Sequence, residues 1–388
     1  MTDTYGTSKP LHPTYNKGMR EIIAGDTTVS TVGDGPLGLR FRGYEVIELA
    51  RHCVFEEVLY LFLHSDLPNK GELDQFSKEM WAMRRLPLSL KLVLEQIGKA
   101  ANIFGVAREV ASFLGVIDPE KPDFSDQKQK AMRTVAIMGP AVMYWYHFAN
   151  KGIRINEITE PNDSVACNLV KLMNLTSNPD PFIVKSMDNM LCLLGDHDFS
   201  ASAFTCRVAA SSRTDYDSAI SAGLSAMKGP IHGGAYFEVS SYLKKLNSIE
   251  EADIFLDKTF KDKTVLFGFG HTINKKMTDP RTKFMLQMAE DLAKTSHGSM
   301  KAFNIAEHIR NRALKEKGLH PNVDFAFEVW SKQCGDRIVS ELPWITFLIG
   351  RLGGLSAHIF DQRTNKTIIR PSSFYIGHGP RQINREKL

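Results

Sequence analysis

Apolar residues recur at helical spacing in several separate stretches of the chain. The pattern spans residues 55–63, residues 284–292 and, over four turns, residues 344–359. This spacing places apolar side chains on one side of a helix, so each stretch predicts an amphipathic helix with one buried face. A more continuous apolar stretch, Thr134 to Trp145, is interrupted by Gly139 and Pro140. Because it is too short to cross a membrane, it predicts a core helix.

The alternation of polar and apolar residues that marks strands is scarce. Short candidates lie around the turn Gly33-Asp34-Gly35 and around Thr364-Asn365-Lys366, ahead of Thr367 to Ile369. We find no internal repeat and no loop long enough to act as a flexible interdomain linker. The sequence therefore predicts an all-α fold with small hairpins, in which any second domain is inserted rather than appended.

Composition narrows the classes of protein that the chain can belong to. Of 388 residues, 43% are apolar and 24% charged, which is enough apolar surface for a large core and excludes intrinsic disorder. The net charge is only +4, with both signs dispersed, so no nucleic-acid or membrane partner is expected and a small-molecule site is favoured. The five cysteines are far apart, which predicts packed thiols in a reducing compartment.

The ends of the sequence predict a cytoplasmic protein. The first residues have neither the apolar core of a signal peptide nor the Arg-rich character of a transit peptide. The last three residues, Glu-Lys-Leu, match the peroxisomal Ser-Lys-Leu signal at two positions only. The mitochondrial matrix and the peroxisome therefore stay open as alternatives.

Three histidines have unusual neighbours. His232 lies between Gly-Pro and Gly-Gly, His271 follows Gly268-Phe269-Gly270, and His197 follows Gly195-Asp196. A single histidine is most often a packing or surface residue, but flanking glycines allow tight turns and close approach of a ligand. The spacing of a helical zinc pair is missing among the three, so we expect no metal site.

Four charged residues downstream complete a candidate constellation: Arg281, Asp324, Arg351 and Arg370. Arg351 stands beside the apolar stripe of residues 344–359, where a guanidinium is costly without an anionic partner. That partner could be a substrate carboxylate or a structural aspartate, and the side chain could also extend to solvent. Together, three histidines, three arginines and one aspartate fit a site that binds a small polyanionic acid and moves a proton.

These residues lie in segments that resemble the citrate synthase family over nearly the whole chain. Lys228-Gly-Pro-Ile-His232-Gly-Gly is similar to the family's KGPLHGG, and Gly268-Phe-Gly-His271 to its GFGH. Four more segments match in the same order: Leu39-Arg-Phe-Arg-Gly-Tyr44, Asp279-Pro-Arg281, Pro321-Asn-Val-Asp324-Phe and Ile368-Ile-Arg370-Pro. Six such matches in family order are far more specific than any one of them.

The resemblance implies an all-α homodimer with the active site between two domains. A large domain would comprise residues 1–233 and 329–388, and a smaller helical domain, residues 234–328, would be inserted in it. The reaction implied is the condensation of an acyl-CoA with oxaloacetate, which gives citrate or a 2-alkylcitrate and releases coenzyme A. The coenzyme A thioester would be a co-substrate, and no tightly bound cofactor or metal is implied.

The resemblance also implies a role for each candidate residue. Asp324 would take a proton from the carbon next to the thioester, His232 would hydrogen-bond the enol or enolate oxygen, and His271 would polarise the ketone. The carboxylates of oxaloacetate would be held by His197, Arg281, Arg351 and Arg370. Of these, Arg370 would reach in from the other subunit. The candidates for contacting coenzyme A are Gly268, Phe269, Gly270, Lys275 and Lys276, although each lysine fits a solvated surface equally well.

Departures from the family pattern bear on the acyl group. Tyr236 stands where the family has asparagine, Thr272 replaces an arginine, and Ala326 stands where a tyrosine follows NVDF. If Tyr236 and Thr272 line the acyl pocket, a longer-chain alkylcitrate synthase is favoured. If Tyr236 points into the small-domain core, an ordinary citrate or 2-methylcitrate synthase fits as well. A citryl-CoA lyase and a silent family member are further alternatives.

Overall fold

The structure is a computed structural model, and it describes residues 16–19, 22–33, 38–157, 159–270, 277–339, 343–373 and 375–381. Within these ranges the chain is almost entirely helical, which confirms the predicted all-α class. Helices α1 to α8 are Val46–His52, Phe55–His64, Lys70–Ala82, Leu88–Glu95, Ile103–Ile117, Gln127–Lys151, Val165–Asn174 and Pro181–Leu193. Helices α9 to α16 are Ala201–Ser211, Tyr216–Met227, Ala235–Leu243, Ile249–Lys261, Pro280–Ala293, Met300–Lys317, Val323–Cys334 and Ile345–Asn365. Two 3₁₀ turns lie at Lys17–Met19 and Gly335–Arg337.

The helices that the apolar spacing predicted are present, as α2, α13 and α16. The apolar stretch from Thr134 to Trp145 lies inside α6, which carries Pro140 in its interior and is buried along most of that stretch. Near the N-terminus, β1 (Ser30–Thr31), β2 (Arg40–Phe41) and β3 (Tyr44–Glu45) form a small antiparallel sheet in that order. The first predicted hairpin is therefore confirmed by the pairing of β1 with β2.

The second predicted hairpin is wrong. Thr364 and Asn365 are the last residues of α16, and Lys366 ends the helix with a left-handed conformation, φ 54°. Residues 367–369 continue as irregular chain. Turn-forming residues at this place therefore end a long helix instead of joining two strands, because the helix is held by packing along its whole length.

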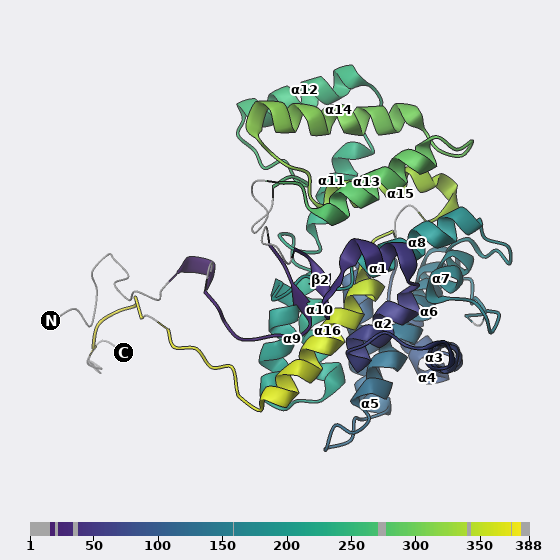
Figure 1. The fold of residues 1–388 in the computed structure, drawn as a ribbon, viewed down its shortest axis with the longest axis vertical. Coiled ribbons are helices and arrows are strands. Elements are labelled where there is room, and N and C mark those ends of the chain that lie inside the picture. The colour runs from purple at the N-terminus through teal and green to yellow at the C-terminus, as the bar shows by residue number, and fades with distance from the viewer. Residues whose placement is uncertain are drawn as a thin grey trace, which may run out of the picture.

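Helix α16 is the central element of the larger group of helices. It is packed against α2, α6, α8, α9 and α10, and it runs through the middle of the view in Figure 1. Almost every residue from Ile345 to Ile359 is buried, on all sides of the helix. A helix buried all round is expected at the centre of a core and not at its surface.

Helices α11 to α15 form a second group beside the first. Helices α12 and α14 lie outermost in Figure 1, and α13 and α15 lie between them and the larger group. Helix α15 packs against α11, α13 and α14, while α13 also contacts α1 and α8. The predicted inserted domain, residues 234–328, stays a prediction, and its boundary at residue 328 falls inside α15.

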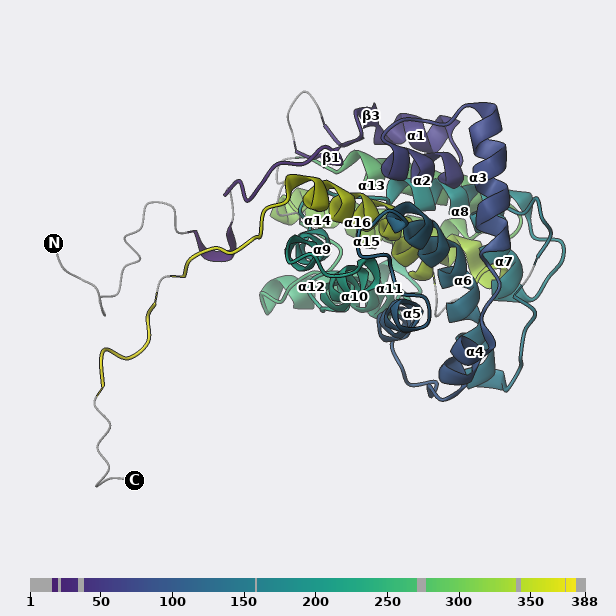
Figure 2. The same cartoon turned by 90° about the horizontal axis from the view of Figure 1, so that it is seen from below.

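Chain segments near both ends leave the body on the same side, as Figures 1 and 2 show from two directions. The C-terminal segment is exposed from residue 370 to residue 373, and Arg370 is part of it. All five cysteines are free thiols, and three of them are buried. Among the described helices, none combines the length and the apolar character needed to cross a bilayer.

Two glycines let α16 approach the end of α8 and the chain that follows it. A β-carbon on Gly350 would lie 2.6 Å from the carbonyl oxygen of Leu191, and one on Gly354 would lie 2.4 Å from that of Gly195. The β-carbon on Gly354 would also meet the Asp196 side chain, at 2.6 Å from Oδ1. These distances are far below van der Waals contact, so glycine is required at both positions.

We expect Gly354→Ala to lower the free energy of unfolding by about 3 kcal/mol, because the new methyl group overpacks against backbone that cannot move aside. Urea unfolding measures this change. The matched control is Gly105→Ala in α5, where a β-carbon would meet no atom within 4 Å. That variant should be as stable as the parent or more stable. Equal stability of the two variants would contradict the tight approach of α16.

Candidate active site

Five of the candidate residues converge from five elements. His197 lies in the loop between α8 and α9, His232 lies in the turn before α11, and Arg281 lies in the first turn of α13. Asp324 is the second residue of α15, and Arg351 lies in the second turn of α16. The charge of Arg351 acts on His232 and that of Arg281 acts on both Arg351 and Asp324. These interactions link Arg281, Arg351, His232 and Asp324, and His197 joins them through Asp279, the partner of Arg281.

Backbone hydrogen bonds fix the turn that carries His232. The carbonyl oxygen of Gly229 accepts from the N–H groups of both His232 and Gly234, each at 3.0 Å. A β-carbon on Gly233 would lie 2.5 Å from the carbonyl oxygen of Met227, so the turn closes onto the end of α10. The glycines around His232 therefore serve the tight turn that the sequence predicted.

A chain of hydrogen bonds joins Arg351 to His232. Nε2 of His232 lies 2.9 Å from the hydroxyl of Ser202, and this hydroxyl lies 3.4 Å from that of Ser200. Nη1 of Arg351 donates to the Ser200 hydroxyl at 3.4 Å. We call Ser200 and Ser202 the serine relay. Because Arg351 can only donate, it leaves the serine hydroxyls able to donate onward toward the imidazole.

Burial lowers the pKa of both His232 and Arg351, the two ends of this chain of hydrogen bonds. Burial, together with the charge of Arg351, lowers the pKa of His232 from 6.5 to about 4. Burial also lowers the pKa of Arg351 from 12.5 to about 10. At neutral pH the imidazole is therefore uncharged, whereas the guanidinium keeps its charge. Nε of Arg351 donates to the carbonyl oxygen of Leu194 at 3.0 Å, and the guanidinium lies over the ring of Phe347.

Asp279 orients Arg281 and lies near His197. Its Oδ1 caps α13 by accepting from the backbone N–H of Arg281 at 2.8 Å. The guanidinium of Arg281 donates to both carboxylate oxygens, from Nε at 3.1 Å and from Nη2 at 2.8 Å, and Nε2 of His197 lies 3.8 Å from Oδ2. Burial alone would raise the pKa of Asp279, but the charges of Arg281 and His197 hold it well below its usual range.

Asp324 has the opposite electrostatic environment. Asn322 caps α15 and accepts from the backbone N–H of Asp324 at 3.0 Å, which fixes the start of the helix. Burial raises the pKa of the Asp324 carboxyl from 3.8 to about 7, although the charge of Arg281 opposes this rise. The side chain is only partly exposed. A carboxyl group with a pKa near neutrality is suited to accept a proton and release it again.

The Gly268-Phe269-Gly270 segment is held against the start of α15. Gly270 N–H donates to the carbonyl oxygen of His320 at 2.8 Å, and Asn322 N–H donates to that of Gly268 at 2.9 Å. Both glycines have positive φ, +85° and +79°, so only glycine adopts this path without strain. The backbone that leads to position 271 is therefore fixed beside Asp324.

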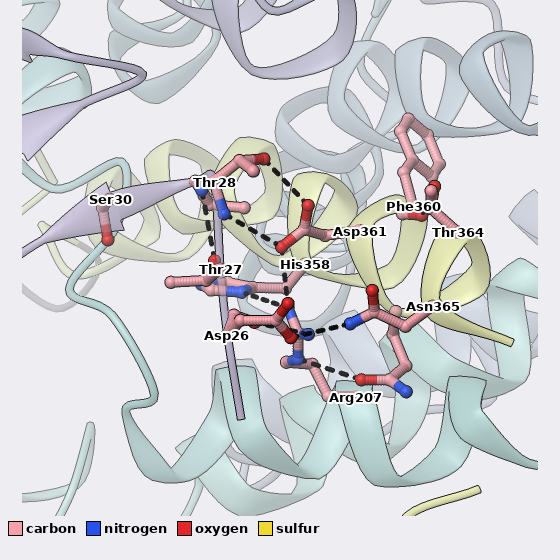
Figure 3. A network of polar contacts seen from close by, with 12 residues as sticks. Asp26, Thr27, Thr28, Ser30, Arg207, His358, Phe360, Asp361, Thr364 and Asn365 are labelled. Carbon is pink, nitrogen blue, oxygen red and sulfur yellow. Dashed lines mark hydrogen bonds and ion pairs between the residues drawn. The ribbon is translucent and has the colours of Figure 1, made fainter. Parts of the chain in front are cut away.

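A buried polar network holds the loop that carries His197. Oδ2 of Asp196 accepts from the Ser30 hydroxyl at 2.5 Å and lies 3.2 Å from Nε2 of His358 on α16. Further along the network, Arg207 donates to Asp361 of α16 and to the carbonyl oxygen of Asp26, both at 3.0 Å, as Figure 3 shows. Segments from near both ends of the chain thus meet behind His197.

The structure brings together His197, His232, Arg281, Asp324 and Arg351, and it leaves Arg370 apart on the exposed C-terminal segment. His271, Lys275 and Lys276 lie outside the described residues. Sequence reasoning missed the serine relay and the roles of Asp279 and Asp196. Asp279 had a recognisable signal, an aspartate followed by proline at a helix start, whereas Asp196 meets His358 across 162 residues.

The direction of Tyr236 removes one argument for a longer acyl chain. Its side chain is 2% exposed and its hydroxyl donates to Oε2 of Glu328 at 2.5 Å. Its ring is stacked on that of Trp344, with centroids 4.6 Å apart and planes at 4°. Tyr236 therefore belongs to the packed interior. This is the alternative that fits an ordinary citrate or 2-methylcitrate synthase as well. Thr272, the other argument, lies outside the described residues.

Residues 18–372 match the family model described as "Citrate synthase, C-terminal domain". The chain belongs to the citrate synthase family. It is therefore a condensing enzyme of the citrate synthase type, as the sequence motifs indicated. In the described ranges of this citrate synthase family member, no group of three or more His, Cys, Asp or Glu side chains could hold a metal ion.

Relatives of the chain carry two related names. A 2-methylcitrate synthase from Shewanella oneidensis is 34% identical over 366 residues, which are 94% of this chain and 96% of the relative. Citrate synthase 2 from Bacillus subtilis is 30% identical, again over 94% of this chain and 96% of the relative. The crystal structure of citrate synthase from Thermotoga maritima matches with a TM-score of 0.84 at 26% identity, over 96% of this chain and 98% of that one. None of these names is that of a longer-chain alkylcitrate synthase.

We expect Asp324→Asn to stabilise the folded protein at alkaline pH. The folded-state pKa of Asp324, about 7, lies above the ordinary 3.8, so the folded state loses stability as the pH rises from about 4 to 7 and the carboxyl ionises. Asparagine cannot ionise, so its advantage should grow by on the order of 2 kcal/mol between pH 5 and pH 8.

Urea unfolding of both proteins at the two pH values measures this difference. Asp74→Asn, which changes an exposed carboxyl on α3, serves as the control and should show no such growth. An advantage for Asp324→Asn that is equal at both pH values would contradict the raised pKa of the Asp324 carboxyl.

Proposed function

We propose that this protein condenses an acyl-CoA with oxaloacetate, releasing coenzyme A and forming citrate or a 2-alkylcitrate. The observation that carries this proposal is the juxtaposition of Asp324, whose pKa is raised to about 7 by burial, with a neutral His232 and two buried arginines. A carboxylate base, an uncharged hydrogen-bond donor and a cationic pocket are the groups that such a condensation needs.

Asp324 removes a proton from the carbon next to the thioester, and His232 stabilises the oxygen on which charge develops. The serine relay supports this role, because a Ser202 hydroxyl that donates to Nε2 leaves the ring proton on Nδ1. Nδ1–H then donates to the thioester oxygen. A neutral imidazole suits this task, since its N–H can donate a hydrogen bond to an enol or enolate oxygen while the ring itself carries no charge.

Arg281, Arg351 and His197 bind the carboxylates of oxaloacetate. Arg281 is oriented by Asp279 and Arg351 by the carbonyl oxygen of Leu194, so both guanidiniums are positioned before substrate arrives. His271 polarises the ketone, and Arg370 completes the pocket from the second subunit of a homodimer. Gly268, Phe269 and Gly270 contact coenzyme A together with Lys275 and Lys276.

The acyl group is short in this proposal. The interior position of Tyr236 gives no support to a pocket widened at that side chain, and relatives at 30% identity or more are named for citrate and 2-methylcitrate. We therefore favour acetyl-CoA and propionyl-CoA over longer thioesters. One methylene separates these two substrates, which is worth about 0.8 kcal/mol when buried, so substantial activity with both is expected.

A free-thiol assay of coenzyme A release tests the reaction. With oxaloacetate present, kcat/KM should be highest for acetyl-CoA or propionyl-CoA and should fall for hexanoyl-CoA and decanoyl-CoA. Asp324→Asn, which keeps the shape of the side chain but cannot accept the proton, should lower kcat by about 10³-fold or more. Preference for decanoyl-CoA would overturn the short-chain assignment, and normal turnover by a folded Asp324→Asn protein would overturn the mechanism.

Mixing two inactive variants tests the homodimer and the role of Arg370. If Arg370 serves the neighbouring site, Arg370→Ala and Asp324→Asn homodimers are both inactive, but a mixed dimer has one intact site. Random exchange of equal amounts makes half of the dimers mixed, each with one of two sites restored, so about one quarter of the wild-type activity should return. Recovery of none, or a monomer in light scattering, would exclude the cross-subunit role.

A further inference from the structure

Tyr236 occupies the junction of three elements that each carry a residue of the proposed site. It lies four residues after His232 at the start of α11, and its hydroxyl donates to Glu328 on α15, the helix that begins with Asp324. Its ring is stacked on Trp344, the residue from which α16 starts toward Arg351. Tyr236 is not one of the residues of the proposed site, yet the three elements that carry such residues meet at its side chain.

The contacts of Tyr236 hold its side chain in one position. Tyr236 and Glu328 are 2% and 1% exposed, and their hydrogen bond measures 2.5 Å between Oη and Oε2. The edge of Phe327, on α15, meets the same ring at 5.5 Å and 87°. Because the ring is stacked on Trp344, meets Phe327 and is tied at its hydroxyl, it cannot tilt without breaking one of these contacts.

The hydrogen bond to Glu328 is costly to remove. Burial raises the pKa of Glu328, and the hydrogen bond from Tyr236 works against this rise. If the hydroxyl is deleted, a buried carboxyl loses one of its donors and keeps Ser240, so it either takes up a proton or moves toward another partner. Glu328 stands one helical turn after Asp324, so a shift of this part of α15 displaces the base.

We propose that Tyr236 is a positioning residue, which sets the distance between His232 and Asp324 by bonding Glu328 and stacking on Trp344. This inference rests on the proposed function, since it concerns the geometry of that reaction. Its consequence is specific: loss of the link should slow removal of the proton from the acyl-CoA and should leave the binding of oxaloacetate nearly unchanged. The carboxylate-binding residues are held by other contacts, those of Asp279 and of Leu194.

The test is Tyr236→Phe, which keeps the stacked ring and removes only the hydroxyl. We expect kcat to fall by about 10-fold or more, since small displacements of reacting groups have large effects on rate, while the KM for oxaloacetate changes less than about twofold. The kinetic isotope effect with acyl-CoA deuterated at the α-carbon should increase, because proton removal becomes more rate-limiting. A purely structural role would not change this isotope effect.

Tyr144→Phe is the matched control. The Tyr144 hydroxyl donates to Glu95 at 2.7 Å in the larger group of helices, so this variant also removes one Tyr–Glu hydrogen bond, which is partly buried. It should lower the melting temperature by a similar amount and leave kcat and the isotope effect at their wild-type values. Equal loss of kcat in both variants would reduce the effect of Tyr236 to general destabilisation and would overturn the proposal.

Variants of Glu328 keep the proposal testable if Tyr236→Phe does not fold. Glu328→Gln retains an oxygen that can accept from Tyr236 and should keep kcat within about threefold, whereas Glu328→Leu should lower kcat as Tyr236→Phe does. Combining Tyr236→Phe with Glu328→Leu leaves no unpaired carboxyl, so stability should recover while kcat stays low.

Two outcomes would overturn the inference in distinguishable ways. A folded Tyr236→Phe protein with the kcat and isotope effect of the wild type would exclude the positioning role and leave the proposed reaction intact. A wild-type protein that releases no coenzyme A from any acyl-CoA in the presence of oxaloacetate would remove the reaction itself, and the positioning role with it.

Discussion

The close approach of α16 to the end of α8 and to the loop that follows it is the constraint on which the rest of the site depends. Hydrogen atoms at Gly350 and Gly354 are all that fits between the helix and the Leu191 and Gly195 carbonyl groups. This contact lets Arg351 reach the carbonyl oxygen of Leu194, and it lets His358 reach Asp196, the neighbour of His197. Two side chains of the proposed site are thus fixed by the same close approach, because a rigid core transmits the position of one to the other.

Two carboxyl groups of the proposed site illustrate how position alone changes the chemistry of a side chain. Asp279 lies between Arg281 and His197 and keeps its negative charge, while Asp324 lies where burial outweighs the charge of Arg281 and raises its pKa. The first group orients a cation, and the second is suited to exchange a proton. Opposite pKa shifts of two carboxyl groups in one site commonly indicate that the two have different roles in a reaction. His232, whose lowered pKa keeps it uncharged at neutral pH, is a further group of the proposed site with a shifted pKa.

Much of this arrangement follows from the sequence, because helical periodicity and the glycine-flanked histidines are local signals. The apolar spacing of residues 344–359 was enough to predict a helix, and the motifs around His232 and Asp324 were enough to predict the site. Contacts between distant segments were not accessible: Ser202 meets His232 across 30 residues, and Tyr236 meets Glu328 across 92. The hairpin expected at residue 364 failed for the same reason, since packing along α16 overrides the local preference for a turn.

The central position of α16 also bears on how the polypeptide acquires its structure during synthesis. Five helices made earlier, α2, α6, α8, α9 and α10, bury their apolar faces against this one helix, and Thr28 bonds Asp361 across 333 residues. Until the ribosome has released residue 362, those faces lack their common partner, and the strands and loops near the N-terminus lack their anchor. Contacts so distant in sequence form slowly and leave apolar surface exposed in the meantime. Nascent chains of this protein are therefore expected to expose aggregation-prone apolar surface until the last core helix is complete.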